Sequence, residues 1–185
     1  SGRGYLCQQR RKGCPSTSLP DLFARGGIVE TAIIIKPHHF VDIISSLGSR
    51  KLSLEPHPYG HAVAKVTALI LTSPERHLVL TPGADDICRP CSHLIHGVCN
   101  DTIDTSWRPL ISPSKYLWNL TIDWRWFHLL GLKPGDSLTV FEFCQLLEPH
   151  LNDLPVVYEE LPAERLAQRF QYLKNGLKFV RDRYT

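Results

Sequence analysis

Residues 81–101 read TPGADDICRPCSHLIHGVCND and contain three of the six cysteines in the chain. Two residues separate Cys88 from Cys91, a spacing that lets a short turn aim both sulfurs at one centre. Seven further residues, including the turn-former Gly97, are enough to bring Cys99 back to the same point. Three soft thiolates on one loop suit zinc or an iron–sulfur cluster and suit magnesium or calcium poorly. The stretch therefore predicts a metal centre.

Two short aliphatic runs define the sheet that we expect around this loop. Residues 32–36 form a β-branched run that ends at Pro37, and residues 77–81 run directly into the cysteine loop. Helical patterns lie between the two runs. The order strand, helices, strand is the one that a right-handed crossover gives between parallel strands. A loop at the carboxyl end of such a strand is a favoured place for a site.

The remainder of the chain is predicted to be mostly helical. The apolar spacing and the capping signals place helices at 38–48, at 61–72, at 116–130, from the capping box of Thr139 and Glu142, and from Pro162 onward. We therefore predict an α+β fold. It should be a single metal-binding domain over residues 31–185, mostly helical, with a small two-stranded parallel sheet.

Composition limits the environment in which the protein works. The chain has 185 residues and no long apolar run, so no membrane association is expected. Residues 1–30 lack the apolar region of a secretory signal. In a chain of this size without such a signal, Cys-x-x-Cys spacing favours metal or redox use over disulfides. These features predict a reducing, cytoplasmic compartment.

Residues 1–30 differ in composition from the rest of the chain. They are rich in Gly, Arg, Ser and Pro, and they hold five basic and two acidic residues, which is the whole formal excess of +3. We predict a disordered tail or leader whose Cys7 and Cys14 are free thiols. The remaining residues are electrically balanced, so nucleic-acid binding is not expected.

Histidines and carboxylates supply the candidate catalytic groups. His38 and His39 follow the first predicted strand, and Asp42 shares a helix face with His38. This pair could be metal ligands, a catalytic pair or an ordinary polar contact. His57 and His61 are four residues apart, but a proline and a glycine between them favour a polar loop near a site over a zinc-binding helix.

Three segments together resemble an uncharacterised, mostly bacterial family of iron–sulfur-binding proteins. They are Lys36-Pro-His-His-Phe, Gly83-Ala-Asp-Asp-Ile-Cys-Arg-Pro-Cys91 and Gly97-Val-Cys-Asn-Asp101. The resemblance covers roughly residues 32 to 180. It implies that Cys88, Cys91 and Cys99 are cluster ligands and that His38 and His39 are the family's paired histidines. It implies no substrate.

The fourth ligand of a cluster is not defined by the local sequence. A [4Fe–4S] cluster normally takes four cysteines, and Cys144 is the one other cysteine after residue 30. We therefore assign Cys144 as the fourth ligand, with His38, His39, His93 and His96 as competitors. An open fourth position would instead let one iron bind a substrate atom.

Three functions fit these features. The first is an iron–sulfur protein, with a [4Fe–4S] cluster, that transfers electrons to a redox partner protein. The second is an enzyme that uses an open cluster iron on a small-molecule substrate, with His38, His39 or Asp86 transferring protons. The third is an interaction module that is stabilised by structural zinc and performs no chemistry.

Overall fold

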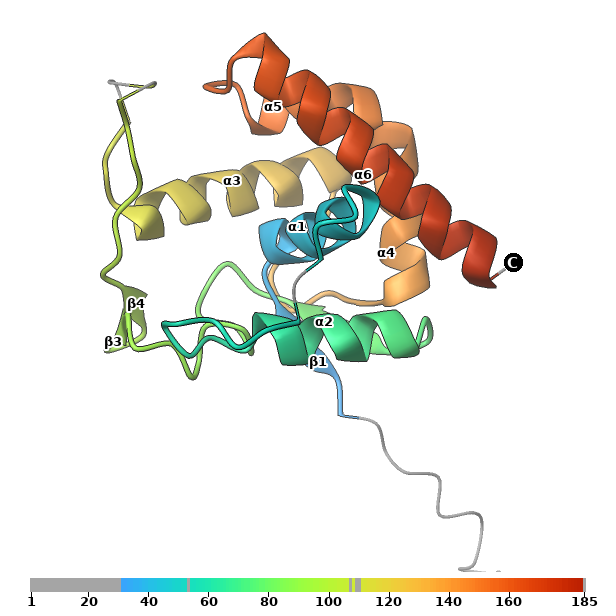
Figure 1. Cartoon of the computed structure of the whole chain (residues 1–185), viewed down its shortest axis with the longest axis horizontal. Coiled ribbons are helices and arrows are strands. Elements are labelled where there is room, and N and C mark those ends of the chain that lie inside the picture. The colour runs from blue at the N-terminus through green and yellow to red at the C-terminus, as the bar shows by residue number, and fades with distance from the viewer. Residues whose placement is uncertain (1–30, 53, 107, 109–110, 185) are drawn as a thin grey trace, which may run out of the picture.

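The chain folds as an α+β structure in which helices pack around a small sheet (Figure 1). The computed structural model describes residues 31–52, 54–106, 108 and 111–184. The predicted tail over residues 1–30, with Cys7 and Cys14, lies outside the described residues. Within the described part, no helix combines the length and the apolar character needed to cross a membrane.

The main sheet has three short strands in the order β1-β2-β5. Strand β1 (Ile33–Ile35) pairs in parallel with β2 (His77–Leu80), with Ile33 opposite Leu78, which confirms the predicted parallel pair. Strand β5 (Ser137–Thr139) pairs antiparallel to β2 and makes the sheet mixed, so the predicted two-stranded sheet was too small. Three residues directly after a turn give no measurable alternation, and the sequence therefore did not reveal β5.

Two helices connect the parallel strands. Helix α1 (Pro37–Gly48) begins at a proline in its first turn, where the missing N–H costs no hydrogen bond. Its side chains Phe40, Val41 and Ile44 are fully buried, because other elements cover most of its circumference. Helix α2 (Val63–Thr72) follows and buries one apolar side. The chain then enters β2 and emerges beside the carboxyl end of β1.

Helix α6 (Ala163–Tyr184) crosses α1 at very close range (Figure 1). The contact depends on two glycines. A Cβ atom on Gly176 would lie 1.9 Å from the carbonyl oxygen of Ile44, and one on Gly48 would lie 1.9 Å from that of Tyr172. Real Cβ atoms do not approach backbone oxygens this closely, so the crossing requires glycine on both helices. The crossing fixes the position of α1, which carries His38 and His39.

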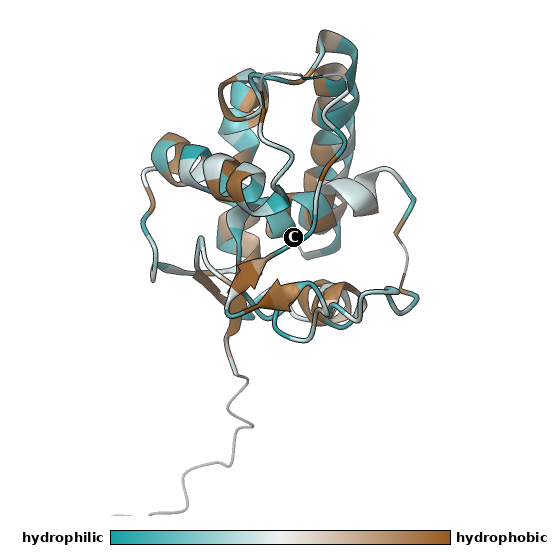
Figure 2. Cartoon of the chain, turned by 90° about the vertical axis from the view of Figure 1, so that its left-hand side faces the viewer, coloured by the Kyte–Doolittle hydropathy of each residue, from teal (hydrophilic) through white to brown (hydrophobic). Residues whose placement is uncertain are grey.

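The remaining helices form the other walls of the structure. They are α3 (Lys115–Leu130), α4 (Val140–Leu147), a 3₁₀ turn (Glu148–Asp153) and the short α5 (Leu154–Val157). The predicted capping box is confirmed, because the Thr139 hydroxyl accepts from Glu142 N and the Glu142 carboxylate accepts from Thr139 N. Figure 2 shows the strands as hydrophobic segments between helices of mixed character. Apolar side chains from the sheet, α1, α3, α4 and α6 form a common core.

Candidate metal centre

The cysteine loop begins with a turn organised by Asp85. Its carboxylate oxygen Oδ1 accepts from the backbone N–H of Cys88 at 2.9 Å, and its carbonyl accepts from that of Arg89. Cys91 N then donates to the carbonyl of Cys88 at 2.9 Å. The two-residue spacing therefore forms the short turn that the sequence predicted. Asparagine and aspartate favour such turns because their side chains can bond the backbone nearby.

A small hairpin returns the third cysteine to the loop. Strand β3 (Leu94–Ile95) pairs with β4 (Val98–Cys99), and Leu94 lies opposite Cys99. The two connecting residues, His96 and Gly97, both have positive φ, at 50° and 82°. Positive φ at both positions defines a type I′ turn, which suits two-residue hairpins and favours glycine. Gly97 thus plays the turn role that its position predicted.

One cavity of about 360 Å³ brings the three cysteines together. Cys88, Cys91 and Cys99 all line it, and each is partly exposed and free of disulfide bonds. His39 from α1 lines the same cavity, as do Tyr59, His61, His93, Asp101, Lys115 and Asn119. The structure therefore places His39, one of the paired histidines, in the same cavity as the three cysteines.

Asp85 connects the loop, β1 and His39. Its side chain has no exposed surface. Oxygen Oδ2 accepts from Lys36 N at 3.0 Å and from His39 Nδ1 at 2.7 Å, while Oδ1 accepts from Cys88 N. Burial alone would raise the pKa of Asp85, but His39 and the hydrogen bond from Lys36 lower this pKa well below its usual range. Asp85 is therefore ionised and accepts three hydrogen bonds.

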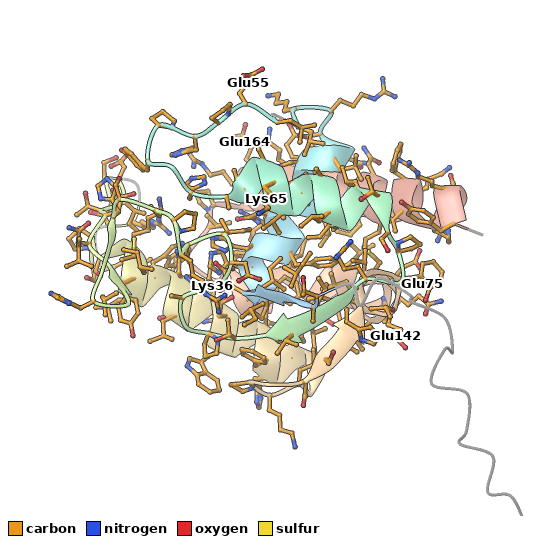
Figure 3. The ribbon with its side chains drawn as sticks, turned by 90° about the horizontal axis from the view of Figure 1, so that it is seen from below. Lys36, Glu55, Lys65, Glu75, Glu142 and Glu164 are labelled. Atoms are coloured by element: carbon orange, nitrogen blue, oxygen red, sulfur yellow. The ribbon has the colours of Figure 1, made fainter. Side chains whose placement is uncertain are left out.

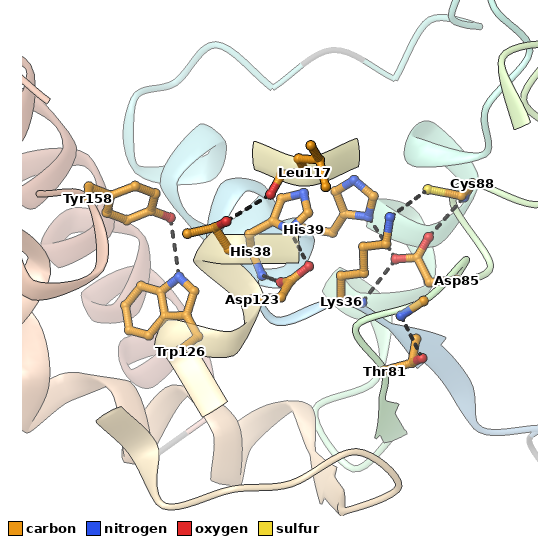
Figure 4. A network of polar contacts seen from close by, with 12 residues as sticks. Lys36, His38, His39, Thr81, Asp85, Cys88, Leu117, Asp123, Trp126 and Tyr158 are labelled. Atoms are coloured by element: carbon orange, nitrogen blue, oxygen red, sulfur yellow. Dashed lines mark hydrogen bonds and ion pairs between the residues drawn. The ribbon is translucent and has the colours of Figure 1, made fainter. Parts of the chain in front are cut away.

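The paired histidines have different surroundings (Figure 4). His39 lies toward Cys88, and the ligand atoms of His39, Asp85 and Cys88 all fall within 4.8 Å of one another. His38 instead donates its backbone N–H and bonds through Nδ1 to Asp123 of α3, both at 2.9 Å. Its side chain is buried and does not line the cysteine cavity. His38 thus links α1 to α3 through hydrogen bonds, whereas His39 is positioned to bind a metal.

The pKa of His39 favours its use as a ligand. Burial lowers this pKa, and the neighbouring His38 lowers it further, although Asp85 acts in the opposite direction. A neutral imidazole is the form that binds metal ions. Because Nδ1 bonds Asp85, the tautomer presents Nε2 as the remaining ligand atom. A carboxylate behind a metal-binding histidine is a common arrangement that fixes the ring.

Lys36 is a site residue that the sequence pattern did not single out. It follows β1 directly and lies at the carboxyl end of the parallel strands, whereas Glu75 and Glu142 lie at the opposite end of the sheet (Figure 3). Its Nζ atom donates to Cys88 Sγ at 3.3 Å. Burial lowers the pKa of Lys36, but Cys88 and Asp85 more than offset this, so the ammonium remains charged. Its position just before the two histidines was the available signal.

Cys88 carries a proton when no metal is bound. Burial and the nearby Asp85 carboxylate raise the pKa of its thiol to about 11, although the Lys36 ammonium acts in the opposite direction. A metal ion binds the thiolate and displaces this proton. Lys36 would then donate a hydrogen bond to a metal-bound sulfur.

Two predicted site residues lie outside the cavity. Cys144 is buried on α4 in the hydrophobic core, and burial raises the pKa of its thiol to about 12. It is not among the described residues that line the cysteine cavity, so the structure does not bring it to the other three. Asp86 accepts from Ile34 N at 2.8 Å and pairs with Arg89 at 2.6 Å. The hydrogen bond from Ile34 links the loop to β1. Asp86 does not line the cavity.

The other candidate histidines either line the cavity or lie outside it. His61 and His93 line the cavity, and His93 bonds through Nδ1 to Asn100 at 2.9 Å. His57 stacks on His61 with 3.6 Å between ring centroids, in the loop that the sequence predicted. His96 is exposed at the tip of the hairpin and does not line the cavity.

Comparisons with known proteins give no match. No family model, no curated protein and no solved structure matches this chain. The resemblance to the iron–sulfur-binding family thus stays a prediction. A functional proposal depends on the chemistry of the site residues.

Proposed function

We propose that this protein binds an iron–sulfur cluster through Cys88, Cys91 and Cys99, with His39 as the fourth ligand, and that it transfers electrons to a redox partner. The observation that carries the proposal is the common cavity lined by all four residues. Thiolate and imidazole are ligands that iron–sulfur centres accept, including centres in which histidine replaces cysteine. The proposal replaces Cys144 with His39, because Cys144 lies in the core.

The breadth of the donor set supports a cluster over a single zinc ion. Zn–S bonds of about 2.3 Å in a tetrahedron place neighbouring ligand atoms about 3.8 Å apart. His39, Asp85 and Cys88 form a group with all ligand atoms within 4.8 Å, and Cys91 and Cys99 fall outside this group. A cluster distributes its cysteines over several irons and accommodates a wider set of sulfurs. A single zinc ion is the alternative to the cluster, and His39 and Cys88 would be among its ligands.

The surroundings of the cysteines support a redox role. A bound cluster would accept and release one electron. Hydrogen bonds to the sulfurs and the identity of the ligands tune the reduction potential of such centres. Here the Lys36 ammonium donates to Cys88, and a neutral imidazole would replace one anionic thiolate. Both features reduce the negative charge at the centre, so they favour the reduced state and raise the potential.

The adjacent histidines provide the test of this ligand set. After anaerobic purification, iron, zinc and acid-labile sulfide are measured in His39→Ala and in the matched control His38→Ala. His39→Ala should lose much of its iron or shift its reduction potential, because it removes a ligand. His38→Ala should keep the iron and potential of wild type and lose stability instead, because His38 bonds Asp123. Equal iron content and potential in wild type and His39→Ala would remove His39 from the ligand set.

A further inference from the structure

A second cavity of about 280 Å³ adjoins the cysteine cavity. Side chains of α1, α3 and α6 line it, together with Arg108 and the segment that follows α5. The two cavities share four lining residues, namely His39, Asp42, Lys115 and Asn119. A molecule in the second cavity would therefore lie next to His39.

The lining of this second cavity is strongly cationic. Its charged side chains, apart from histidines, are Arg108, Lys115, Arg165 and Arg169 against the single carboxylate of Asp42. The whole chain has 21 basic and 18 acidic residues, so this local excess does not reflect composition. Asp42 is already bound to Arg169 at 2.7 Å. Lys115 is likewise bound to Asp101, at 2.8 Å, so Arg108 and Arg165 carry the positive excess of the lining.

Arg108 has the least exposed side chain of these four cations. It is 8% exposed, and its guanidinium carbon lies 4.0 Å above the centre of the Trp118 ring. Stacking on an aromatic ring fixes the plane of the guanidinium fork. Burial and the nearby charge of Arg165 lower the pKa of Arg108, while Glu160 and Asp104 oppose this effect. The Glu160 carboxylate itself makes two hydrogen bonds of 2.8 Å to Arg125.

We propose that this second cavity binds a small anion through a phosphate or carboxylate group, with Arg108 and Arg165 as its principal partners. Guanidinium groups bind both kinds of oxyanion through paired hydrogen bonds. The cavity has room for the equivalent of roughly nine water molecules, which fits a small metabolite. This inference depends on the cationic cavity alone, so it stands or fails independently of the metal centre.

Isothermal titration calorimetry tests the proposal on the full chain. Inorganic phosphate and acetate are titrated separately at constant ionic strength, and the tighter ligand identifies the preferred group. We expect saturable binding to wild type and a loss of roughly 10-fold or more in affinity for Arg108→Gln and for Arg165→Gln. Arg183→Gln is the matched control, because Arg183 lies on the same helix as Arg165 and does not line the cavity.

Three results would overturn the inference. They are the absence of saturable binding of either anion, equal affinity in wild type and Arg165→Gln, and an equal loss of affinity in Arg183→Gln. Arg165 is exposed, so its replacement should leave the fold intact, and circular dichroism checks this. Repeating the titration on Cys88→Ser separates the two sites. The anion should still bind when the metal is lost.

Discussion

Replacement of Asp85 by asparagine should damage both the fold and the site. The carboxylate is fully buried and accepts hydrogen bonds from Lys36 N, Cys88 N and His39 Nδ1, at 3.0, 2.9 and 2.7 Å. Asparagine has nearly the same shape but offers one acceptor oxygen and one amide donor. In any orientation, the amide NH₂ group faces at least one N–H donor that it cannot satisfy.

The expected loss follows from the number of bonds. A hydrogen bond to a charged group contributes about 1.5–3 kcal/mol, and a buried donor left without a partner costs a similar amount. Asparagine retains some of the three bonds in neutral form, so we expect the free energy of unfolding to fall by about 3 kcal/mol. The destabilisation caused by Asp85→Asn should have its full size above about pH 4, the ordinary pKa of aspartate. It should shrink below that pH, because the folded-state pKa of Asp85 is depressed and its stabilisation disappears on protonation.

Asp86→Asn is the matched control for this measurement. Asp86 is the next residue, is partly exposed, and makes one backbone bond that an asparagine oxygen can also accept. Its pair with Arg89 lies at the surface and contributes at most about 1 kcal/mol. Urea unfolding of both variants at pH 7, followed by circular dichroism, gives the comparison. Losses within about 1 kcal/mol of each other would refute the role assigned to Asp85.

Four further predictions concern the fold and the metal. Gly176→Ala should lower the free energy of unfolding by about 2 kcal/mol or more, because the new Cβ would meet the Ile44 carbonyl. Helix propensity alone predicts a gain of about 1 kcal/mol, so a more stable variant in urea would contradict the close crossing. Thr139→Ala should cost about 1 kcal/mol through loss of the cap. The Thr139 N–H lowers the pKa of Glu142, so Glu142→Gln should be less stable than wild type above about pH 4.5 and equal to it in stronger acid. A chelator should lower the melting temperature of wild type and leave that of Cys88→Ser unchanged.

The sequence predicted those parts of the fold that have a long local pattern. The helices at 61–72 and 116–130 were found within two residues of their observed limits, and the parallel pairing of β1 with β2 followed from chain order. Strand β5 was missed because its three residues are defined by pairing with β2 and not by their own pattern. The glycine crossing of α1 and α6 joins residues more than one hundred positions apart, and no local signal marks it.

The sequence predicted the part of the site that forms from local contacts and missed the part that depends on long-range packing. Cys88, Cys91 and Cys99 share a cavity because a turn and a hairpin bring them together locally. Long-range packing decides which histidine faces that cavity, and the adjacent His38 turns to Asp123 instead. Cys144 was assigned by elimination among cysteines, and its core position follows from the apolar stripe that contains it.

Metal analysis of single cysteine variants tests the central claim most directly. Iron, zinc and acid-labile sulfide are measured per chain after anaerobic purification of wild type, of Cys88→Ser, Cys91→Ser and Cys99→Ser, and of Cys144→Ser. We expect iron and sulfide in wild type and in Cys144→Ser, and the loss of most of both in the other three, since a hydroxyl replaces a soft thiolate poorly. Full metal content in all three loop variants, or its loss in Cys144→Ser alone, would contradict the assignment of the metal centre to residues 81–101.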